Sequence, residues 1–94
     1  MAINYKKEYK EDYEIYLISF RRMAKRKDYN ALRMNVEQIK ERDTSPVFQH
    51  MAKEKFSLKL SHNASKHALR DFKNECHKKG FTIFGKRLKQ GYIK

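Results

Sequence analysis

The chain has 94 residues, of which 23 are Lys or Arg and 11 are Asp or Glu, so its formal net charge is +12. This length predicts a single domain over residues 1–94, and the aromatic content of 13% argues against a disordered chain. The longest apolar run, near Ile15–Phe20, is far shorter than the ~20 residues of a membrane span, and the N-terminal residues lack the apolar run of a signal peptide. We therefore expect no contact with a membrane. Because Cys76 has no disulfide partner in the chain, a reducing compartment is the natural setting, and we expect a cytoplasmic protein or, in a eukaryote, a nuclear one.

Glycine and proline are scarce, with three and one residues respectively, which suits long helices joined by short connections. We therefore expect a mainly α fold, organised as a compact bundle of four to five helices.

The first helix is expected at about Tyr5–Lys27, where apolar residues recur at helical spacing. Ile15 and Ile18 fall on the opposite, polar side, so the middle of this helix is apolar nearly all round. Either two neighbouring elements or another chain must cover such a helix, and we predict a partner interface at Tyr13, Ile15 and Ile18. Ile15 and Ile18 would also serve as the seam of a homodimer. The main apolar stripe of this helix consists of Tyr9, Tyr13, Tyr16, Leu17, Phe20 and Ala24.

Two further helices are marked by their capping residues. Asp28 can cap a helix of about Tyr29–Arg42. Ser45 and Pro46 supply a hydroxyl cap and a proline suited to the first helical position, which predicts a helix of about Pro46–Lys55. The residues expected in the core are Tyr29, Leu32, Val36 and Ile39 from the first of these helices, and Val47, Phe48, Met51 and Ala52 from the second.

A fourth helix is expected at about Ala64–Lys79, capped by Ser61 or Asn63 and ended by Gly80. Residues 56–61 before it alternate between apolar and polar, which fits either a short strand or an extension of a helix. The short polar link gives the C-terminal half the outline of a helix-turn-helix or winged-helix module. The apolar face of the fourth helix consists of Ala68, Leu69, Phe72 and Cys76.

The tail, Phe81 to Lys94, fits either a short hairpin with a basic tip or a last helix. Lys and Gln are weak strand formers, so the helix is slightly preferred.

A basic stripe follows one side of the predicted fourth helix. Lys66, Arg70, Lys73 and His77 are spaced i, i+4, i+7 and i+11, nearly opposite the apolar face. A helix that is apolar behind and basic in front can lie against a phosphate backbone or enter a major groove. These four residues are therefore predicted to bind nucleic acid, although a solvated charged face gives the same pattern.

Two other basic groups are candidates for phosphate contact. Four bases form two adjacent i, i+4 rows near the end of the first helix, which exceeds what the helix dipole requires. These are Arg21, Arg22, Lys25 and Arg26. The tail adds Lys86, Arg87 and Lys89.

Together these groups predict a small, non-catalytic nucleic-acid-binding protein, with duplex DNA slightly preferred over RNA because the basic stripe is helical. The rival hypothesis is an inhibitor or adaptor of the phage or mobile-element type that docks on a protein of a nucleic-acid-processing complex. No motif for phosphate cradling or nucleophilic catalysis occurs, so we expect no enzyme activity. His62 and His67 have the spacing of one ligand pair of a zinc site, but the other half of the pattern lacks its thiolates, so we expect neither a metal nor a cofactor.

Overall fold

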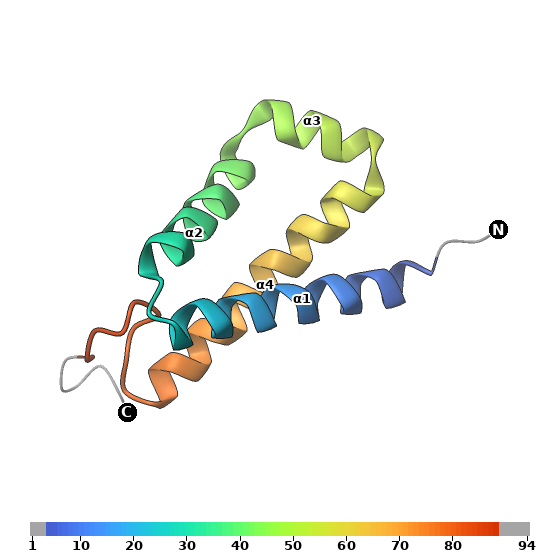
Figure 1. Ribbon diagram of the computed structural model, residues 1–94. Helices are drawn as coiled ribbons and strands as arrows, with labels where there is room; N and C mark the ends of the chain where they lie inside the picture. Colours follow the sequence, from blue (N-terminus) through green and yellow to red (C-terminus); the bar gives the residue numbers. More distant parts are fainter. Residues whose placement is uncertain (1–3, 89–94) are drawn as a thin grey trace.

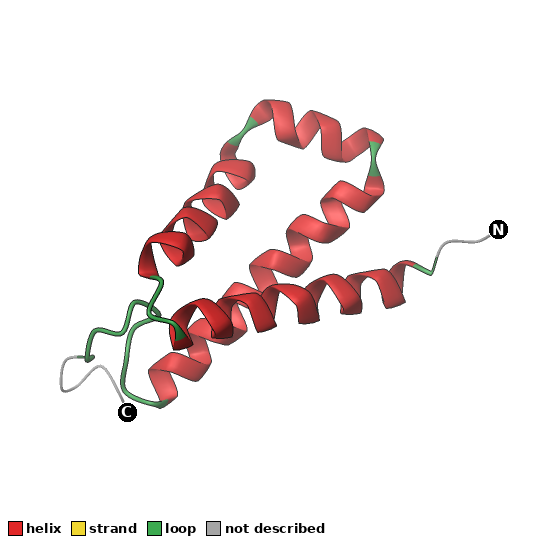
Figure 2. Ribbon diagram, viewed as in Figure 1, coloured by secondary structure: helices red, strands yellow, loops and turns green. Residues whose placement is uncertain are grey.

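The computed structural model describes residues 4–88, and these residues form four helices. The helices are α1 (Tyr5–Lys25), α2 (Tyr29–Thr44), α3 (Pro46–Glu54) and α4 (Phe56–Lys78), followed by an irregular segment (Figures 1 and 2). The predicted mainly α fold is therefore confirmed.

The two long helices, α1 and α4, lie side by side and run in the same direction (Figure 1). Their contacts keep one direction along both helices, from Tyr5 against Phe56 to Phe20 against Phe72. Between them in the chain, α2 turns back from the end of α1, and the short helix α3 crosses over to the start of α4 (Figure 1). This order brings the C-terminal ends of α1 and α4 together at one end of the molecule.

The predicted capping residues begin the middle helices. The side chain of Asp28 accepts a hydrogen bond from the Ala31 amide at 3.2 Å, and Ser45 accepts one from the Phe48 amide at 3.2 Å. Pro46 lies in the first turn of α3, where a backbone amide has no acceptor within the helix, so the missing N–H of proline costs no hydrogen bond. Only Ser45 separates α2 from α3, and only Lys55 separates α3 from α4.

The predicted start of the fourth helix is wrong. Residues 56–61 are helical, so α4 begins at Phe56 and the predicted caps Ser61 and Asn63 lie inside it. The ring of Phe56 packs edge-on against Tyr5, with 4.6 Å between the ring centroids, so a contact with α1 supports this first turn where no side chain caps it. Of the two alternatives for residues 56–61, a helix rather than a strand is therefore confirmed.

The preferred helix in the tail is also wrong for the residues that the structure describes. Residues 81–88 form a tight hairpin turn with one antiparallel bridge between Phe81 and Arg87. The Thr82 amide donates to the Lys86 carbonyl at 2.7 Å, and Gly85 adopts a positive φ of 78° that closes the turn. The prediction for residues 89–94 lies outside the described part of the chain.

The core is built by α1, α2 and α4. Its buried members come from the predicted stripes of these helices, and Leu69 and Cys76 are half-buried around them. In α3, by contrast, only Ala52 is buried, while Val47 and Met51 are 70% and 47% exposed. This short helix of nine residues buries only one narrow edge, so the predicted core residues of α3 are wrong except for Ala52 and the half-buried Phe48. The central cluster consists of Phe20, Leu32, Ile39, Ala68 and Phe72.

None of the helices in residues 4–88 combines the length and the apolar character needed to cross a membrane.

Candidate nucleic-acid interface

Three segments that are distant in sequence deliver their basic residues to one end of the molecule. Because α1 and α4 are parallel, both helix ends meet there, and the hairpin after α4 folds back onto the start of α2 (Figure 1). The side chains of Lys25 and Lys79 line the same surface hollow between α1 and α4. The exposed bases of these segments, called the basic end below, are Arg22, Lys25, Arg26, Lys27, Lys78, Lys79, Lys86 and Arg87.

The basic end is shaped by two helix terminations of the same kind. After α1, the Asp28 amide bonds back to the Met23 carbonyl at 2.9 Å, and after α4 the Phe81 amide bonds to the Cys76 carbonyl at 3.0 Å. Both are Schellman closures, which need a residue in the left-handed conformation just past the helix. Gly80 fills this position after α4 with a φ of 88°, whereas Lys27 fills it after α1 with a φ of 58°. The two terminations turn the chain sharply and leave the last basic side chains of each helix exposed.

The hairpin is fixed to this end by aromatic packing. Ile83 and Phe84 pack against the central cluster, and the guanidinium of Arg33 on α2 lies 5.6 Å from the centroid of the Phe84 ring. Gly85 lies so close to Tyr29 that an added Cβ would be 2.9 Å from the ring carbon Cζ. Lys86 and Arg87 are therefore displayed on a segment that is held against α2.

Acidic groups are few at this end. Asp28 caps α2, and Glu75 accepts hydrogen bonds from two of the three guanidinium nitrogens of Arg21, Nε and Nη2. Within residues 4–88, none of the eight bases of the basic end forms an ion pair. Unpaired bases at a single end produce a positive potential that attracts anions.

The predicted group at the end of α1 is divided by the structure. Arg21 is held in its ion pair with Glu75, which raises the pKa of the guanidinium, while Arg22, Lys25 and Arg26 are exposed. Lys25 faces the hollow shared with α4, and Arg22 and Arg26 line a second hollow on the outer side of α1. Three of the four predicted residues thus belong to the basic end.

The predicted stripe on α4 is partly occupied by intramolecular contacts. Lys66 lies 3.1 Å from Asp43, Arg70 lies 3.3 Å from its neighbour Asp71, Lys73 is exposed and His77 is half-buried. The stripe begins well inside the 23 residues of α4, whereas the recognition helix of helix-turn-helix proteins contacts bases through its N-terminal residues. Exposed ion pairs are weak, so Lys66 and Arg70 remain predicted phosphate ligands of lower rank than the basic end.

In the tail, Lys86 and Arg87 are exposed on the hairpin, and Lys89 lies outside the described residues.

Tyr13 of the predicted partner interface makes a contact within the chain, and the interface itself stays a prediction. The Tyr13 hydroxyl donates to the Asp71 carboxylate, which raises the pKa of the phenol and lowers that of the carboxyl. One turn earlier, the Tyr9 hydroxyl shares a hydrogen bond with Nδ1 of His67. The tyrosines are therefore used within the chain, to join α1 to α4. Ile15 and Ile18 lie away from the core, on the polar side of α1, and are 64% and 51% exposed.

A buried polar contact that the sequence reasoning missed joins α2 to α4. His62 is 5% exposed, and its Nε2 donates to the Asp43 carboxylate at 2.7 Å, while Phe48 packs edge-on against the ring. The hydrogen bond from His62, followed by that from Lys66, lowers the pKa of Asp43. Nδ1 of His62 is buried without a hydrogen-bond partner among the described residues. The i, i+4 spacing of His62 and Lys66 indicates that both lie on one side of the helix, but nothing in the sequence indicates that both contact Asp43.

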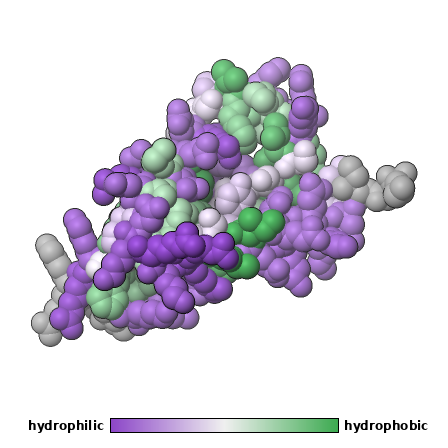
Figure 3. Space-filling model, in the orientation of Figure 1, coloured by the Kyte–Doolittle hydropathy of each residue, from purple (hydrophilic) through white to green (hydrophobic). Residues whose placement is uncertain are grey.

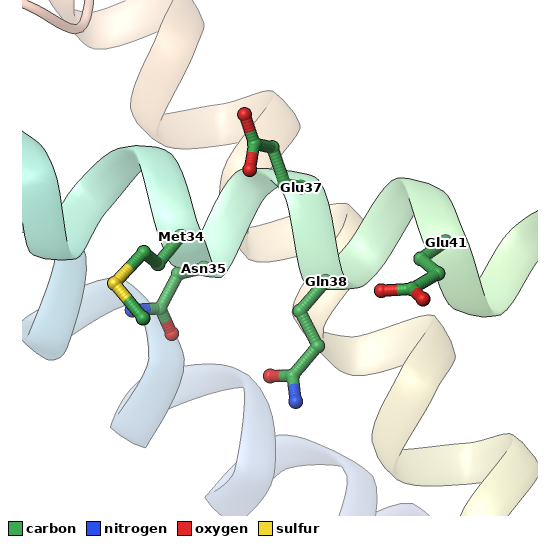
Figure 4. Close-up of a pocket in the computed structure, with 5 residues that line it drawn as sticks. All are labelled: Met34, Asn35, Glu37, Gln38 and Glu41. Carbon is green, nitrogen blue, oxygen red and sulfur yellow. The ribbon is translucent and has the colours of Figure 1, made fainter.

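The remaining surface hollows offer no better site. One lies on the outer side of α2, and all five of its lining side chains come from that single helix (Figure 4). They include Glu37 and Glu41, so this surface would repel a polyanion. Cys76 faces the hollow beside Lys79, where burial raises the pKa of the thiol and makes it a poor nucleophile. Within residues 4–88, no three His, Cys, Asp or Glu side chains come together to hold a metal ion.

Comparison of the chain with known protein families, with curated proteins and with solved structures found no match.

Proposed function

We propose that this protein binds nucleic acid through the basic end, by contacts to the phosphate backbone and without catalysis. The observation that carries the proposal is the parallel arrangement of α1 and α4, which gathers eight exposed and unpaired bases from three segments of residues 4–88. Positive and negative charges that are spread evenly over a surface compensate one another. A local excess of positive charge attracts a polyanion such as nucleic acid.

The geometry favours recognition of the backbone over recognition of bases. The basic side chains come from helix ends and a hairpin rather than from the length of one exposed helix. They therefore form a broad cluster and not a row that could enter one groove of a duplex. Duplex DNA remains our preferred ligand over RNA, since the described residues contain no sheet with exposed aromatic rings on which single-stranded bases could stack.

The test is a salt titration of binding to duplex DNA, single-stranded DNA and duplex RNA of equal length. If six to eight phosphates are contacted, affinity for duplex DNA should fall by about 10³- to 10⁴-fold between 50 and 200 mM salt. Absence of binding to all three nucleic acids at low salt would refute the proposal and favour docking on an acidic protein surface.

A matched pair of variants locates the interface. Lys86→Glu/Arg87→Glu reverses two charges at the basic end, and Lys53→Glu/Lys55→Glu reverses two exposed charges where α3 meets α4, at the opposite end. Both variants lower the net charge equally, so they weaken long-range attraction alike. We expect the hairpin variant to lose about tenfold more affinity than its control. Equal losses would contradict the assignment to the basic end.

A further inference from the structure

The outer face of α1 carries a second ordered pattern. Six residues follow each other at alternating spacings of three and four, which is the seam of a heptad repeat. Two acids come first, two isoleucines follow and two bases come last. The seam consists of Glu8, Glu11, Ile15, Ile18, Arg22 and Lys25.

This seam is available for contact. Most of it lies opposite the stripe that packs against α4, while Lys25 lies at its edge and borders the hollow shared with α4. Five of its six residues are exposed, and Glu8 is half-buried. Ile15 and Ile18 border a surface hollow that also includes Arg22. Figure 3 shows this hydrophobic area over the middle of α1, surrounded by hydrophilic side chains. Isoleucine pairs at this exposure leave apolar area in water that a partner would bury.

The order of charges selects the partner. If a second copy of α1 lies antiparallel, with the two-fold axis midway between Tyr16 and Leu17, each seam residue meets one of complementary type. Glu11 then faces Arg22 of the other copy, and Ile15 faces Ile18. Glu8 likewise faces Lys25, and the second half of the interface repeats these pairs by symmetry. We propose that the occupant of this face is a second copy of this chain, in an antiparallel α1–α1 dimer.

The parallel alternative is excluded by the same charges. It would place Glu11 opposite Glu11 and Arg22 opposite Arg22, so each layer outside the isoleucines would be repulsive. The antiparallel overlap from Glu8 to Lys25 spans roughly 26 Å of helix. It also places the two basic ends at opposite ends of the shared helix pair, which limits repulsion between two chains of charge +12. With four isoleucines as its apolar centre, the dimer should dissociate on dilution.

The dimer does not depend on nucleic acid, although the two proposals share Arg22 and Lys25. In the dimer these two bases face acids of the other copy, and six bases of the basic end stay exposed for phosphate contact. Dimerisation is therefore measured first, without nucleic acid, so that the two proposals can fail separately.

The test is sedimentation equilibrium of the full chain over a range of concentrations at fixed salt. In a dimer of Glu11→Arg, the introduced arginine faces Arg22 of the other copy, and in a dimer of Arg22→Glu the introduced glutamate faces Glu11. Like charges then face each other at both positions, so each variant alone should raise the dimer dissociation constant about tenfold or more. An equimolar mixture of the two variants restores both pairs. In the mixed dimer the introduced arginine of one chain faces the introduced glutamate of the other, and the unchanged Arg22 faces the unchanged Glu11. We expect the mixture to form heterodimers at least as tightly as the unmodified chain forms homodimers.

Control variants separate the seam from general charge effects. Glu41→Arg makes the same charge change on the outer side of α2 and should leave the dimer constant unchanged, while Ile18→Ser should abolish dimerisation. Circular dichroism of each variant checks that the helices are retained. A chain that stays monomeric at all concentrations, a mixture that does not associate, or an equal effect of Glu41→Arg would overturn the proposal.

Discussion

The close approach of Gly85 to Tyr29 gives a prediction whose size can be worked out from two separate terms. In Gly85→Ala, the new residue must keep a φ near 78°, which costs an L-residue about 1–2 kcal/mol. Its Cβ also meets the Tyr29 ring, with Cζ only 2.9 Å away, and crowding of this kind costs about 1–3 kcal/mol. We therefore expect the free energy of unfolding to fall by about 2–5 kcal/mol.

The two terms can be measured separately by urea unfolding followed by circular dichroism. Gly80→Ala introduces the same residue at a φ of 88° and reports the conformational term. Adding Tyr29→Ala removes the ring, so Gly85→Ala should cost about 1–3 kcal/mol less in that background. A loss below about 0.5 kcal/mol in the single variant, the size expected for an ordinary surface substitution, would refute the reasoning. Equal losses with and without the Tyr29 ring would refute the steric term alone.

Three further predictions concern the helix end, the buried histidine and the thiol. Lys27→Gly should raise the free energy of unfolding by about 0.5–1 kcal/mol, because glycine adopts the φ of 58° without strain; thermal unfolding checks this, and a loss of stability would contradict it. The hydrogen bond from His62 holds the pKa of Asp43 below its usual 3.8, so the stability it supplies is present above that pH and lost as pH falls through the lowered value. In Asp43→Asn, the free energy of unfolding should accordingly decline less below pH 3.8 than in the unmodified chain, as measured by acid unfolding. The difference should be less than about 1 kcal/mol because the carboxylate is partly exposed, and equal declines would contradict the assignment. Cys76 should react with a thiol reagent at pH 7 several times more slowly than in the urea-unfolded chain, and equal rates would show that its raised pKa and burial have no effect.

The local signals in the sequence predicted the helices well. Asp28, Ser45 and Pro46 act through contacts within one helical turn, and the structure has each of them where its chemistry requires. The apolar stripes of α1, α2 and α4 meet in the core for the same reason, because helical periodicity is a local property. The first turns of α4 could not be predicted in this way, since Phe56 is held by Tyr5 from a distant part of the chain.

The candidate site depended on information that no local pattern carries. The sequence identified basic groups on the first and fourth helices, but it did not reveal that these helices run parallel and end together. Lys27, Lys78 and Lys79 were therefore missed, although they join Lys25 at the same end. Likewise, the hydrogen bond from Tyr13 to Asp71 could not be predicted, because the acceptor lies 58 residues further along the chain.

The elongated shape of the molecule gives the basic end a geometric meaning. The principal extents are 50 × 27 × 27 Å, and the ends of α1 and α4 lie at one tip of the long axis (Figure 1). A body charged in this way turns its tip toward a polyanion, so under the proposed function each chain would stand on a duplex rather than lie along it. Its footprint would then be about eight base pairs instead of about fifteen, at 3.4 Å per base pair.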